Sequence, residues 1–348
     1  MSEFSSLSDR FRPQGVYLDT ATYGLPSLRV MAAMTRALER WQAGVATMDE
    51  YDEAVAASRD LMATVLGSPT DRVAVANQVS VFSGLIASSL PDGTRVVVPE
   101  GEFTSLLFPF LVGKDRGIRV REVPAPELAG SINAEDDLVA FSLVQSSDGS
   151  VLDSDAIVRA ARAADARIVV DATQAAGWYP FDPSLFDYTV ISAYKWLLCP
   201  RGTAFLVLGA DAAPLTPAFA GWYAGDEVWK SIYGSPLRLA PSARRYDVSP
   251  AWFSWVGAVP SLDLIASLGL EAIHRHDVGL AQLARERLGL TPSGSAMLSI
   301  PLDDPSVLRA HGIAASVRAG SVRVGFHLYN DEGDVERLVT AVESARRG

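Results

Sequence analysis

Two side chains of opposite charge stand at the ends of neighbouring predicted strands. Asp171 follows the apolar run 167–170, and Lys195 comes shortly after the next run, 189–192. Because α/β proteins bind ligands at the carboxyl ends of their strands, both side chains are expected to face one site. A lysine can form a Schiff base with an aldehyde cofactor, and a carboxylate can keep a pyridine nitrogen protonated. Alone, each residue reads as a helix cap or a solvated strand end, but the pair in this order favours pyridoxal phosphate chemistry.

The elements that must position this pair alternate regularly along the chain. Short aliphatic runs separated by helical patterns predict a mostly parallel sheet covered by helices. The seven expected strands span residues 73–76, 95–99, 118–123, 138–143, 167–170, 189–192 and 203–208. The predicted fold class is therefore α/β.

Two helices are expected before the sheet. Ser27 can cap the first, whose apolar positions recur with a helical period, and the second, 49–66, ends at Gly67. The apolar positions of the first are Val30, Met31, Met34, Leu38 and Trp41.

The rest of the chain predicts a second, smaller unit. Residues 211–250 are rich in Pro, Gly, Trp and Tyr and are expected to form a long active-site loop. Beyond this loop come helices at 253–268 and 270–288, strands near 297–300 and 322–326, and a helix at 332–346. We expect a large cofactor-binding domain at 16–245 and a small α+β domain at 246–348, with residues 1–15 packing on the latter.

Composition narrows the classes of function. The chain has 348 residues and a net charge of -11, which would repel nucleic acid and anionic membranes. The sequence shows neither a signal peptide nor an apolar run of about 20 residues, so a cytoplasmic protein is expected. Cys199 is the single cysteine, which excludes a structural zinc or iron–sulfur cluster, and no metal site is expected.

Other catalytic motifs are absent or weak. No two glycines stand two residues apart, so a GxGxxG loop is impossible, and the chain has no GxSxG or HExxH motif. Ser192 and Lys195 match the SxxK pattern of serine β-lactamases, but its companion motifs are missing. His274 and His276 lie on a predicted helix without further metal ligands, and surface positions explain them better.

With these residues in place, the sequence resembles the class V aminotransferase branch of fold-type I pyridoxal phosphate enzymes, which includes cysteine desulfurases and isopenicillin N epimerase-like proteins. The resemblance covers nearly the whole chain and rests on the joint spacing of segments 17–24, 171–174, 192–196 and 323–330. It implies a fold-type I architecture, pyridoxal 5'-phosphate as cofactor, a small amino-acid substrate and a homodimer.

The resemblance also implies roles for individual residues. Lys195 would carry the cofactor, Asp171 would hold its pyridinium nitrogen, and Gln174 would hydrogen-bond its phenolic oxygen. Residues implied to bind the phosphate are Val79, Ser80, Ser192 and Tyr194, with Ser249 supplied by the partner subunit. Arg323 would grip the substrate α-carboxylate, and Ser146 would lie beside it. From their aromatic character, Tyr23 near the entrance and the loop that contains Trp222 could line a pocket for an apolar or sulfur-bearing side chain. The Trp222 loop could equally be a subunit interface.

Three departures from the family pattern bear on the reaction. Phe103 stands where desulfurases stack a histidine on the cofactor ring, so stacking is kept but an acid–base group is lost. Segment 311–321 is short and has no cysteine, and Cys199 is expected to be an inert buried residue. Ser146 replaces an asparagine that relatives place beside the ring. The first two changes make desulfuration doubtful, and the third means that the substrate preference of the relatives does not carry over to this chain.

The leading expectation is an aminotransferase that acts on the α-amino group of an amino acid. The main alternative is a β-eliminating carbon–sulfur lyase on a cysteine conjugate, because both reactions begin with loss of the α-proton to Lys195. An epimerase ranks lower. A non-catalytic descendant also ranks lower, since both Asp171 and Lys195 are retained.

Overall fold

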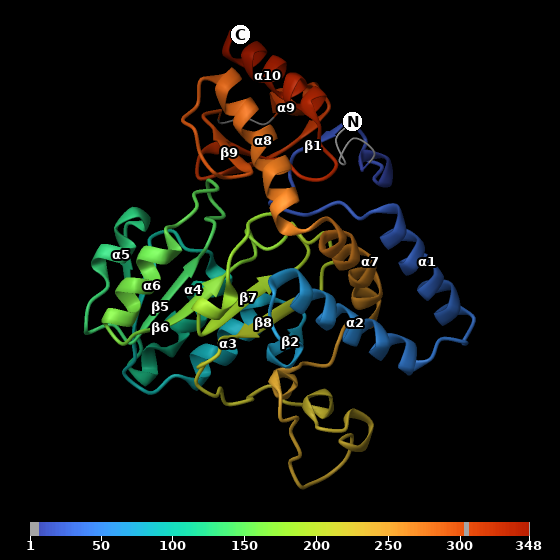
Figure 1. The fold of residues 1–348 in the computed structure, drawn as a ribbon, viewed down its shortest axis with the longest axis vertical. Helices are drawn as coiled ribbons and strands as arrows, with labels where there is room; N and C mark the ends of the chain where they lie inside the picture. Colours follow the sequence, from blue (N-terminus) through green and yellow to red (C-terminus); the bar gives the residue numbers. More distant parts are fainter. Residues whose placement is uncertain (1–6, 303–305, 348) are drawn as a thin grey trace.

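The molecule is built around a twisted central sheet that the sequence predicted (Figure 1). A computed structural model describes residues 7–302 and 306–347. Within them the sheet has seven strands in the order β2-β8-β7-β6-β5-β3-β4, and β8 runs antiparallel to both neighbours while the other pairs are parallel. The strands are β2 Val73–Ala76, β3 Arg95–Pro99, β4 Arg119–Val123, β5 Leu138–Ser142, β6 Arg167–Asp171, β7 Tyr188–Ser192 and β8 Ala204–Leu208. The predicted mostly parallel, seven-stranded sheet is confirmed.

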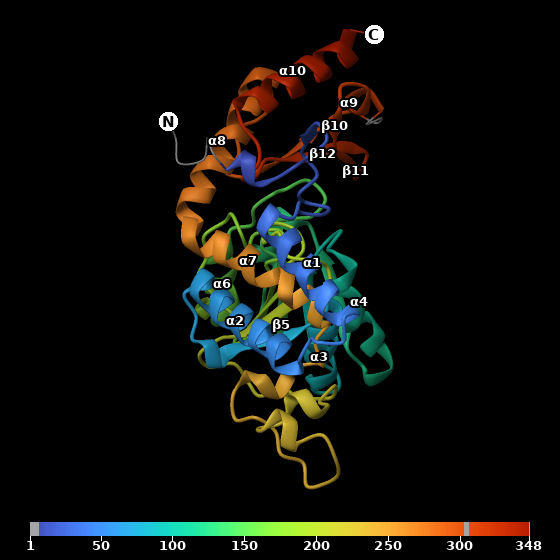
Figure 2. The same cartoon turned by 90° about the vertical axis from the view of Figure 1, so that its right-hand side faces the viewer.

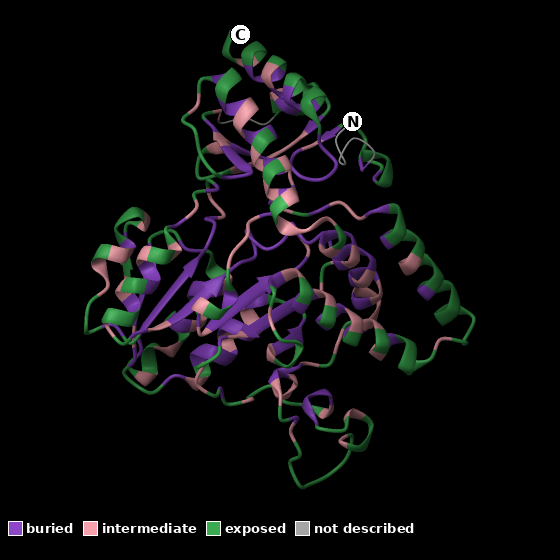
Figure 3. Cartoon of the chain, in the orientation of Figure 1, coloured by how far each residue is buried: buried purple, intermediate pink, exposed green. Residues whose placement is uncertain are grey.

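Helices cover both faces of this sheet, which explains why its inner strands are nearly continuous apolar runs; the edge strand β4 carries charged residues and is partly exposed. Val96 and Val98 of β3 pack into one core cluster with helices α3 and α4, whereas Val97 between them belongs to the opposite cluster with α2, α6 and α7. Figure 3 shows the inner strands of the sheet buried along their length, whereas the edge strand β4 is partly exposed. The covering helices are α2 Met48–Leu66, α3 Val79–Ser89, α4 Thr104–Val112, α5 Leu128–Ser131, α6 Ser154–Ala163 and α7 Trp252–Leu268.

The helices that precede the sheet begin and end at the predicted signals. Helix α1, Leu28–Gln42, starts at Ser27, whose hydroxyl accepts the N–H of Val30 at 3.3 Å. Helix α2 ends at Gly67, which adopts a left-handed φ of 64°.

The apolar face predicted for α1 is only partly buried. Val30 is fully covered, but Met31, Leu38 and Trp41 are 50%, 46% and 63% exposed. Helix α1 packs mainly on α7 and lies on the outside of the molecule, as Figure 2 shows. A single neighbour covers only a narrow stripe of a helix, so much of the apolar face stays exposed within the described part of the chain, although the Trp41 ring lies 5.3 Å from the Phe253 ring.

The long loop between β8 and α7 has short 3-10 turns at Trp222–Ala224, Val228–Lys230 and Ala243–Tyr246. It projects from the sheet on the side away from the C-terminal unit (Figure 1). Its return is anchored, because Asp247 forms a buried ion pair with Arg59 at 2.6 Å and accepts the N–H of Val75 at 2.8 Å.

The C-terminal unit has a core of its own. It comprises α8 Leu270–Leu288, β9 Met297–Ile300, α9 Ser306–Ala310, β10 Ile313–Ala314, β11 Ser316–Arg318, β12 Ser321–Gly325 and α10 Glu332–Arg347. Strand β1, Val16–Tyr17, pairs in parallel with β10, and Val16 and Leu18 are buried in this core. The expected smaller α+β region is present, with the start of the chain built into it.

The domain boundaries expected at 245 and 246 stay a prediction. Helix α7 lies after that boundary yet packs on α1 and α2. Of the N-terminal segment 1–15, residues 1–6 lie outside the described part, while the Phe11 ring meets the Tyr329 ring edge-on at 5.1 Å. Among the described residues no single helix is long and apolar enough to cross a membrane; α7 and α8 reach that length and composition only as a pair bent by 85°.

Candidate active site

A cavity of about 460 Å³ opens where β5, β6 and β7 end, and it contains the lysine and the carboxylate that the sequence singled out. Its volume lies in the range of small-molecule sites. It is lined by Asn77, Gln78, Val79, Phe103, Ser105, Ser142, Ser146, Asp171, Thr173, Gln174, Ser192, Tyr194, Lys195, Arg201, Gly202 and Ala251. A larger hollow of about 890 Å³ between α1, α2 and α7 contains many alanines and no lysine.

Asp171 is the last residue of β6 and is almost fully buried. Its Oδ1 accepts the N–H of Thr173 at 2.8 Å. Burial raises the pKa of Asp171 to about 6, and the charge of Glu102 adds to this rise, whereas hydrogen bonds from Thr173 and the charge of Lys195 oppose it. A carboxylate with a raised pKa is the stronger proton acceptor, which suits the binding of a protonated ring nitrogen.

Lys195 lies in the turn between β7 and β8 and is 5% exposed. Burial lowers the pKa of its ammonium group to about 8; the arginines Arg323, Arg318 and Arg201 lower it further, while Asp171 acts in the opposite direction. A neutral amine is thus accessible near neutral pH, and the neutral form is the nucleophile and the base. The Nζ atom lies 5.3 Å from the centre of the Phe103 ring.

The turn that carries Lys195 is held by close backbone contacts. The N–H of Gly24 donates to the carbonyl of Tyr194 at 2.9 Å, and a Cβ on Gly24 would lie 2.1 Å from the Lys195 carbonyl oxygen. The carbonyl of Trp196 accepts Nε2 of His327 at 2.9 Å. Contacts from an N-terminal segment (Gly24) and from the C-terminal unit (His327) therefore fix the position of the lysine.

One end of the cavity is built to receive an anion. Helix α3 begins there at Val79, and its N-cap Gln78 makes no side-chain cap hydrogen bond. Free amides at a helix N-terminus attract negative charge. Ser192 and Tyr194 line the same cavity. Ser80, expected to act beside Val79, faces instead a second hollow between α3 and α4.

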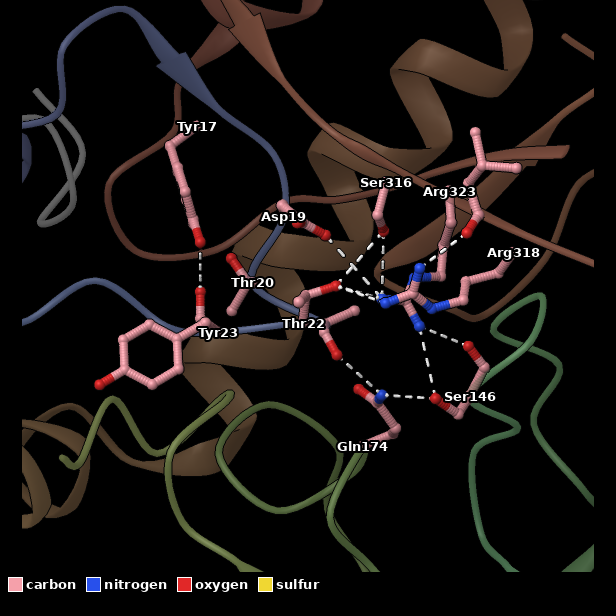
Figure 4. A network of polar contacts seen from close by, with 12 residues as sticks. Tyr17, Asp19, Thr20, Thr22, Tyr23, Ser146, Gln174, Ser316, Arg318 and Arg323 are labelled. Atoms are coloured by element: carbon pink, nitrogen blue, oxygen red, sulfur yellow. Dashed lines mark hydrogen bonds and ion pairs between the residues drawn. The ribbon is translucent and has the colours of Figure 1, made fainter. Parts of the chain in front are cut away.

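Gln174 is the centre of a hydrogen-bond network at the other side of the cavity (Figure 4). Its Nε2 donates to the carbonyl of Ala21 at 3.0 Å and to the hydroxyl of Ser146 at 3.1 Å. Its Oε1 accepts the indole N–H of Trp196 at 2.8 Å. Both expected residues, Gln174 and Ser146, line the cavity, but the amide of Gln174 is already engaged by the protein.

Arg323 lies behind Ser146 and is 1% exposed. Figure 4 shows its guanidinium surrounded by protein oxygens: it donates to the carbonyl and hydroxyl of Ser146, to Thr22 at 2.7 Å and to Ser316 at 3.3 Å. Its Nε is buried without a partner among the described residues. Burial lowers the pKa of Arg323 to about 10. Arg323 contacts the cavity wall rather than lining the cavity itself.

Three other expected site residues also lie outside the cavity lining. The Tyr23 ring is 39% exposed and lies 5.9 Å from the Tyr194 ring. Trp222 packs on Trp229 within the projecting loop, with ring centres 5.3 Å apart. Ser249 is exposed on the anchored return of that loop.

Glu102 organises the site, although it was not among the site residues predicted from the sequence. Its buried carboxylate accepts the N–H of Phe103 at 2.6 Å, and the N–H and hydroxyl of Ser142 at 2.7 and 2.5 Å. Ser142 lies opposite Asp171 in the sheet register. An acidic residue directly before the predicted stacking aromatic was the available signal.

Cys199 and the histidines take no direct part in the cavity lining. Cys199 is 2% exposed, and burial raises the pKa of its thiol well above the ordinary value. His327 is fully buried between Asp277 and Trp196, with Nδ1 2.7 Å from Asp277 Oδ2. His274, expected at the surface, is only half-exposed, because its ring stacks on the Trp178 ring with the ring centres 5.8 Å apart.

These features fit pyridoxal phosphate. The buried amine could take its aldehyde carbon, the Asp171 carboxylate its ring nitrogen, the Phe103 ring one face of its ring, and the free amides of α3 its phosphate. Fold and site together define a fold-type I pyridoxal phosphate enzyme.

Comparison with known proteins gives the family. Residues 16–310 match the model of the aminotransferase class-V family, and the chain belongs to this family. The family and the cofactor expected from the sequence, pyridoxal 5'-phosphate, are thereby confirmed. The chain is 27% identical to an isopenicillin N epimerase of Amycolatopsis lactamdurans (82% of this chain, 83% of the relative) and 25% identical to a probable cysteine desulfurase of Streptomyces coelicolor (95% and 92%).

Solved structures share the fold. The cysteine desulfurase CsdA of Escherichia coli superposes with a TM-score of 0.85 at 20% identity, covering 100% of this chain and 99% of that one. The cystine C-S lyase C-DES, in complex with its product cysteine persulfide, gives a TM-score of 0.84 at 19% identity, covering 94% and 96%. These likenesses confirm the fold-type I architecture.

Proposed function

We propose that this protein is an aminotransferase that acts on the α-amino group of a small amino acid. The observation that carries the proposal is the buried amine of Lys195, whose pKa is lowered to about 8 in a cavity it shares with Asp171. The cofactor, when bound, supplies an electron-withdrawing ring that acidifies the α-proton of an attached amino acid. The chain's own task is then to move that proton, and a neutral Nζ is the group placed to do so.

The other residues in the cavity would hold the reacting groups in place. Asp171 would keep the proton on the ring nitrogen, and Phe103 would fix the plane of the ring. Substrate carboxylate would be bound beside Ser146, where the guanidinium of Arg323 provides positive charge from behind. Arg323→Lys keeps the charge but cannot make all the hydrogen bonds to Ser146, Thr22 and Ser316 that hold this wall of the cavity, so the substrate KM should rise by about 10- to 100-fold, the range for a charged hydrogen bond.

A β-eliminating carbon–sulfur lyase is the second candidate. The removal of the α-proton by Lys195 serves both reactions. Several sequence relatives are named probable cysteine desulfurases, so a sulfur-bearing substrate is supported as a class. A persulfide-forming desulfurase is less well supported, because the one cysteine is buried with a raised thiol pKa.

The products of single and multiple turnovers separate these reactions. Purified protein loaded with cofactor is incubated with a panel of amino acids, with and without a keto acid, and products are identified by mass spectrometry. An aminotransferase converts its cofactor to pyridoxamine phosphate and stops unless a keto acid is added. Repeated release of pyruvate and ammonia without a keto acid would replace our proposal by the lyase, and exchange of the α-proton with inversion alone would replace it by an epimerase. Lys195→Ala is the inactive control.

We also propose a homodimer with residues shared across its interface. Support comes from Ser249, which is exposed on a rigidly anchored segment, and from the uncovered apolar face of α1. Mixing Lys195→Ala chains with Ser249→Ala chains should restore some activity through hybrid sites. A fully active monomer in light scattering would contradict the dimer.

A cytoplasmic location is a further proposal, which cell fractionation would test.

A further inference from the structure

Arg201 is a cation in the active-site cavity to which the sequence analysis gave no role. It lies six residues after Lys195, at the start of the segment that leads into β8. Among the residues that line the cavity, Arg201 and Lys195 are the two that carry a positive charge. The amine of Lys195 is needed for the aldehyde carbon of the cofactor. Arg201 is therefore the lining cation that remains to bind an anionic group.

The backbone around Arg201 is fixed in place. Its carbonyl accepts the hydroxyl of Ser254 at 2.8 Å, and the next residue, Gly202, adopts a φ of 101° that side-chain-bearing residues rarely adopt. A Cβ on Gly202 would lie 2.9 Å from the Ser254 hydroxyl oxygen. The turn therefore presents the arginine from a rigid base.

The side chain of Arg201 is positioned without being neutralised. Its guanidinium carbon lies 4.8 Å from the centre of the Tyr194 ring, a cation–π contact that orients the planar group. Among the ion pairs of the described residues, none involves Arg201. An exposed and unpaired guanidinium at a cavity is ready to bind an anion.

The groups near Arg201 indicate which anion it binds. Tyr194, on which it stacks, lies two residues from Ser192, and both line the cavity together with the uncapped start of α3 at Gln78 and Val79. The α-carboxylate of a substrate has Arg323 behind Ser146 on the Gln174 side. A planar guanidinium suits a phosphate dianion, because it donates two parallel hydrogen bonds to it.

We propose that Arg201 is the cationic anchor of the cofactor phosphate, acting together with the free amides of α3. This assignment rests on the cofactor that family membership brings. Tyr194 is a positioning residue in this arrangement, because its ring holds the guanidinium over the phosphate site. The positive charge at the phosphate site is then supplied by the turn that follows Lys195 in the same chain.

The test compares two aldehydes that differ only in the phosphate. Dissociation constants of pyridoxal 5'-phosphate and of pyridoxal are measured on cofactor-free protein by absorbance titration and equilibrium dialysis. For Arg201→Gln we expect binding of pyridoxal 5'-phosphate to weaken by about 10- to 100-fold, the range for a charged hydrogen bond, with binding of pyridoxal unchanged. Arg201→Lys should recover part of the loss, and raised salt should weaken wild type more than Arg201→Gln.

Controls distinguish this role from misfolding and from substrate binding. Arg119→Gln, an exposed arginine on the edge strand β4, should bind both aldehydes like wild type. Circular dichroism and thermal melting should match for all variants. An equal loss for both aldehydes, no loss for either, or a raised substrate KM with unchanged cofactor affinity would overturn the assignment. A wild-type chain that bound neither aldehyde would overturn the cofactor itself, and this assignment with it.

Discussion

His327 donates from Nε2 to the carbonyl of Trp196, the residue directly after Lys195, at 2.9 Å. Its other ring nitrogen lies 2.7 Å from Asp277, and both side chains are fully buried. Since a carbonyl can only accept, the imidazole donates from Nε2, and its Nδ1 faces the Asp277 carboxylate. Through this pair the C-terminal unit holds the segment that bears the catalytic lysine.

Removal of the imidazole should therefore destabilise the protein strongly. His327→Ala leaves Asp277 buried without its partner, and the free energy of unfolding should fall by about 3–5 kcal/mol in urea denaturation. His311→Ala, at an exposed position, should change it by less than about 0.5 kcal/mol. Equal stabilities for the two variants would show that the buried pair contributes nothing to the fold.

Two glycine substitutions should have opposite effects. Gly24→Ala forces a Cβ to 2.1 Å from the Lys195 carbonyl, so the turn must shift and stability should fall by about 1–3 kcal/mol, with weaker cofactor binding. Gly84→Ala adds a Cβ in open space on helix α3 and should raise stability by about 0.5–1 kcal/mol. Thermal melting and cofactor titration of both variants check this contrast. Tight cofactor binding by Gly24→Ala would refute the close-contact argument.

Cofactor loading should depend on pH through Lys195. Only the neutral amine attacks an aldehyde, and burial lowers the pKa of Lys195 from 10.5 to about 8. The rate of loading at limiting cofactor should rise about tenfold per pH unit below pH 8 and level off above it. Stopped-flow absorbance measures this rate, and a rise that continued to pH 10 would mean an unperturbed lysine.

The same shift affects stability, with a definite sign. Between pH 8 and 10.5 the unfolded chain binds more protons at this lysine than the folded chain does. The contribution of Lys195 to the free energy of unfolding should therefore rise with pH across that window. Urea titrations of cofactor-free wild type and Lys195→Met at several pH values measure this contribution as the difference between their free energies of unfolding. A difference that did not change with pH would rule the contribution out.

Glu102→Gln should disturb the site without touching the cavity surface. The amide has one acceptor oxygen where the carboxylate serves Phe103 and Ser142 with two, so stability should fall by about 1.5–3 kcal/mol. Loss of the negative charge should also lower the pKa of Asp171, which carbon-13 chemical shifts of the labelled carboxyl group can follow. The control Glu100→Gln, at an exposed position, should leave both quantities unchanged.

Cys199 should be chemically silent in the folded protein. Its thiol is buried with a raised pKa, so iodoacetamide should not modify it until the chain is unfolded. Cys199→Ala should keep most of the turnover. Mass spectrometry after incubation with cysteine checks for a persulfide, whose appearance on Cys199 would restore desulfuration as a candidate reaction.

Local patterns were enough to predict the strands and the positions of the two central site residues. The inner strands are buried on both faces and consist mainly of aliphatic residues, and Ser27 and Gly67 mark helix ends through local geometry alone. The proximity of Asp171 and Lys195 could be predicted because parallel strands bring their carboxyl ends together.

The remaining features depend on contacts between distant segments. The hydrogen bonds of Glu102 join β3 to β5, and the His327 contact joins the C-terminal unit to the lysine turn. The burial of Arg323 behind Ser146 also depends on tertiary structure, because the residues it donates to are spread from Thr22 to Ser316. The exposure of Met31, Leu38 and Trp41 on α1 could not be predicted, because helical periodicity does not reveal whether a partner covers an apolar face.

The pairing of β1 with β10 has a consequence for biosynthesis. Val16 lies opposite Ile313, so it finds its partner only after the long stretch of chain between the two residues has been synthesised. Closing so large a loop is slow, and it follows the more local pairings of the central sheet. Thr22, which lies just beyond β1 and accepts from Arg323, is brought into place by the same late event. A nascent chain can thus assemble the lysine and its carboxylate while the Arg323 side of the pocket is still missing, and activity should emerge only after β10 has paired with β1.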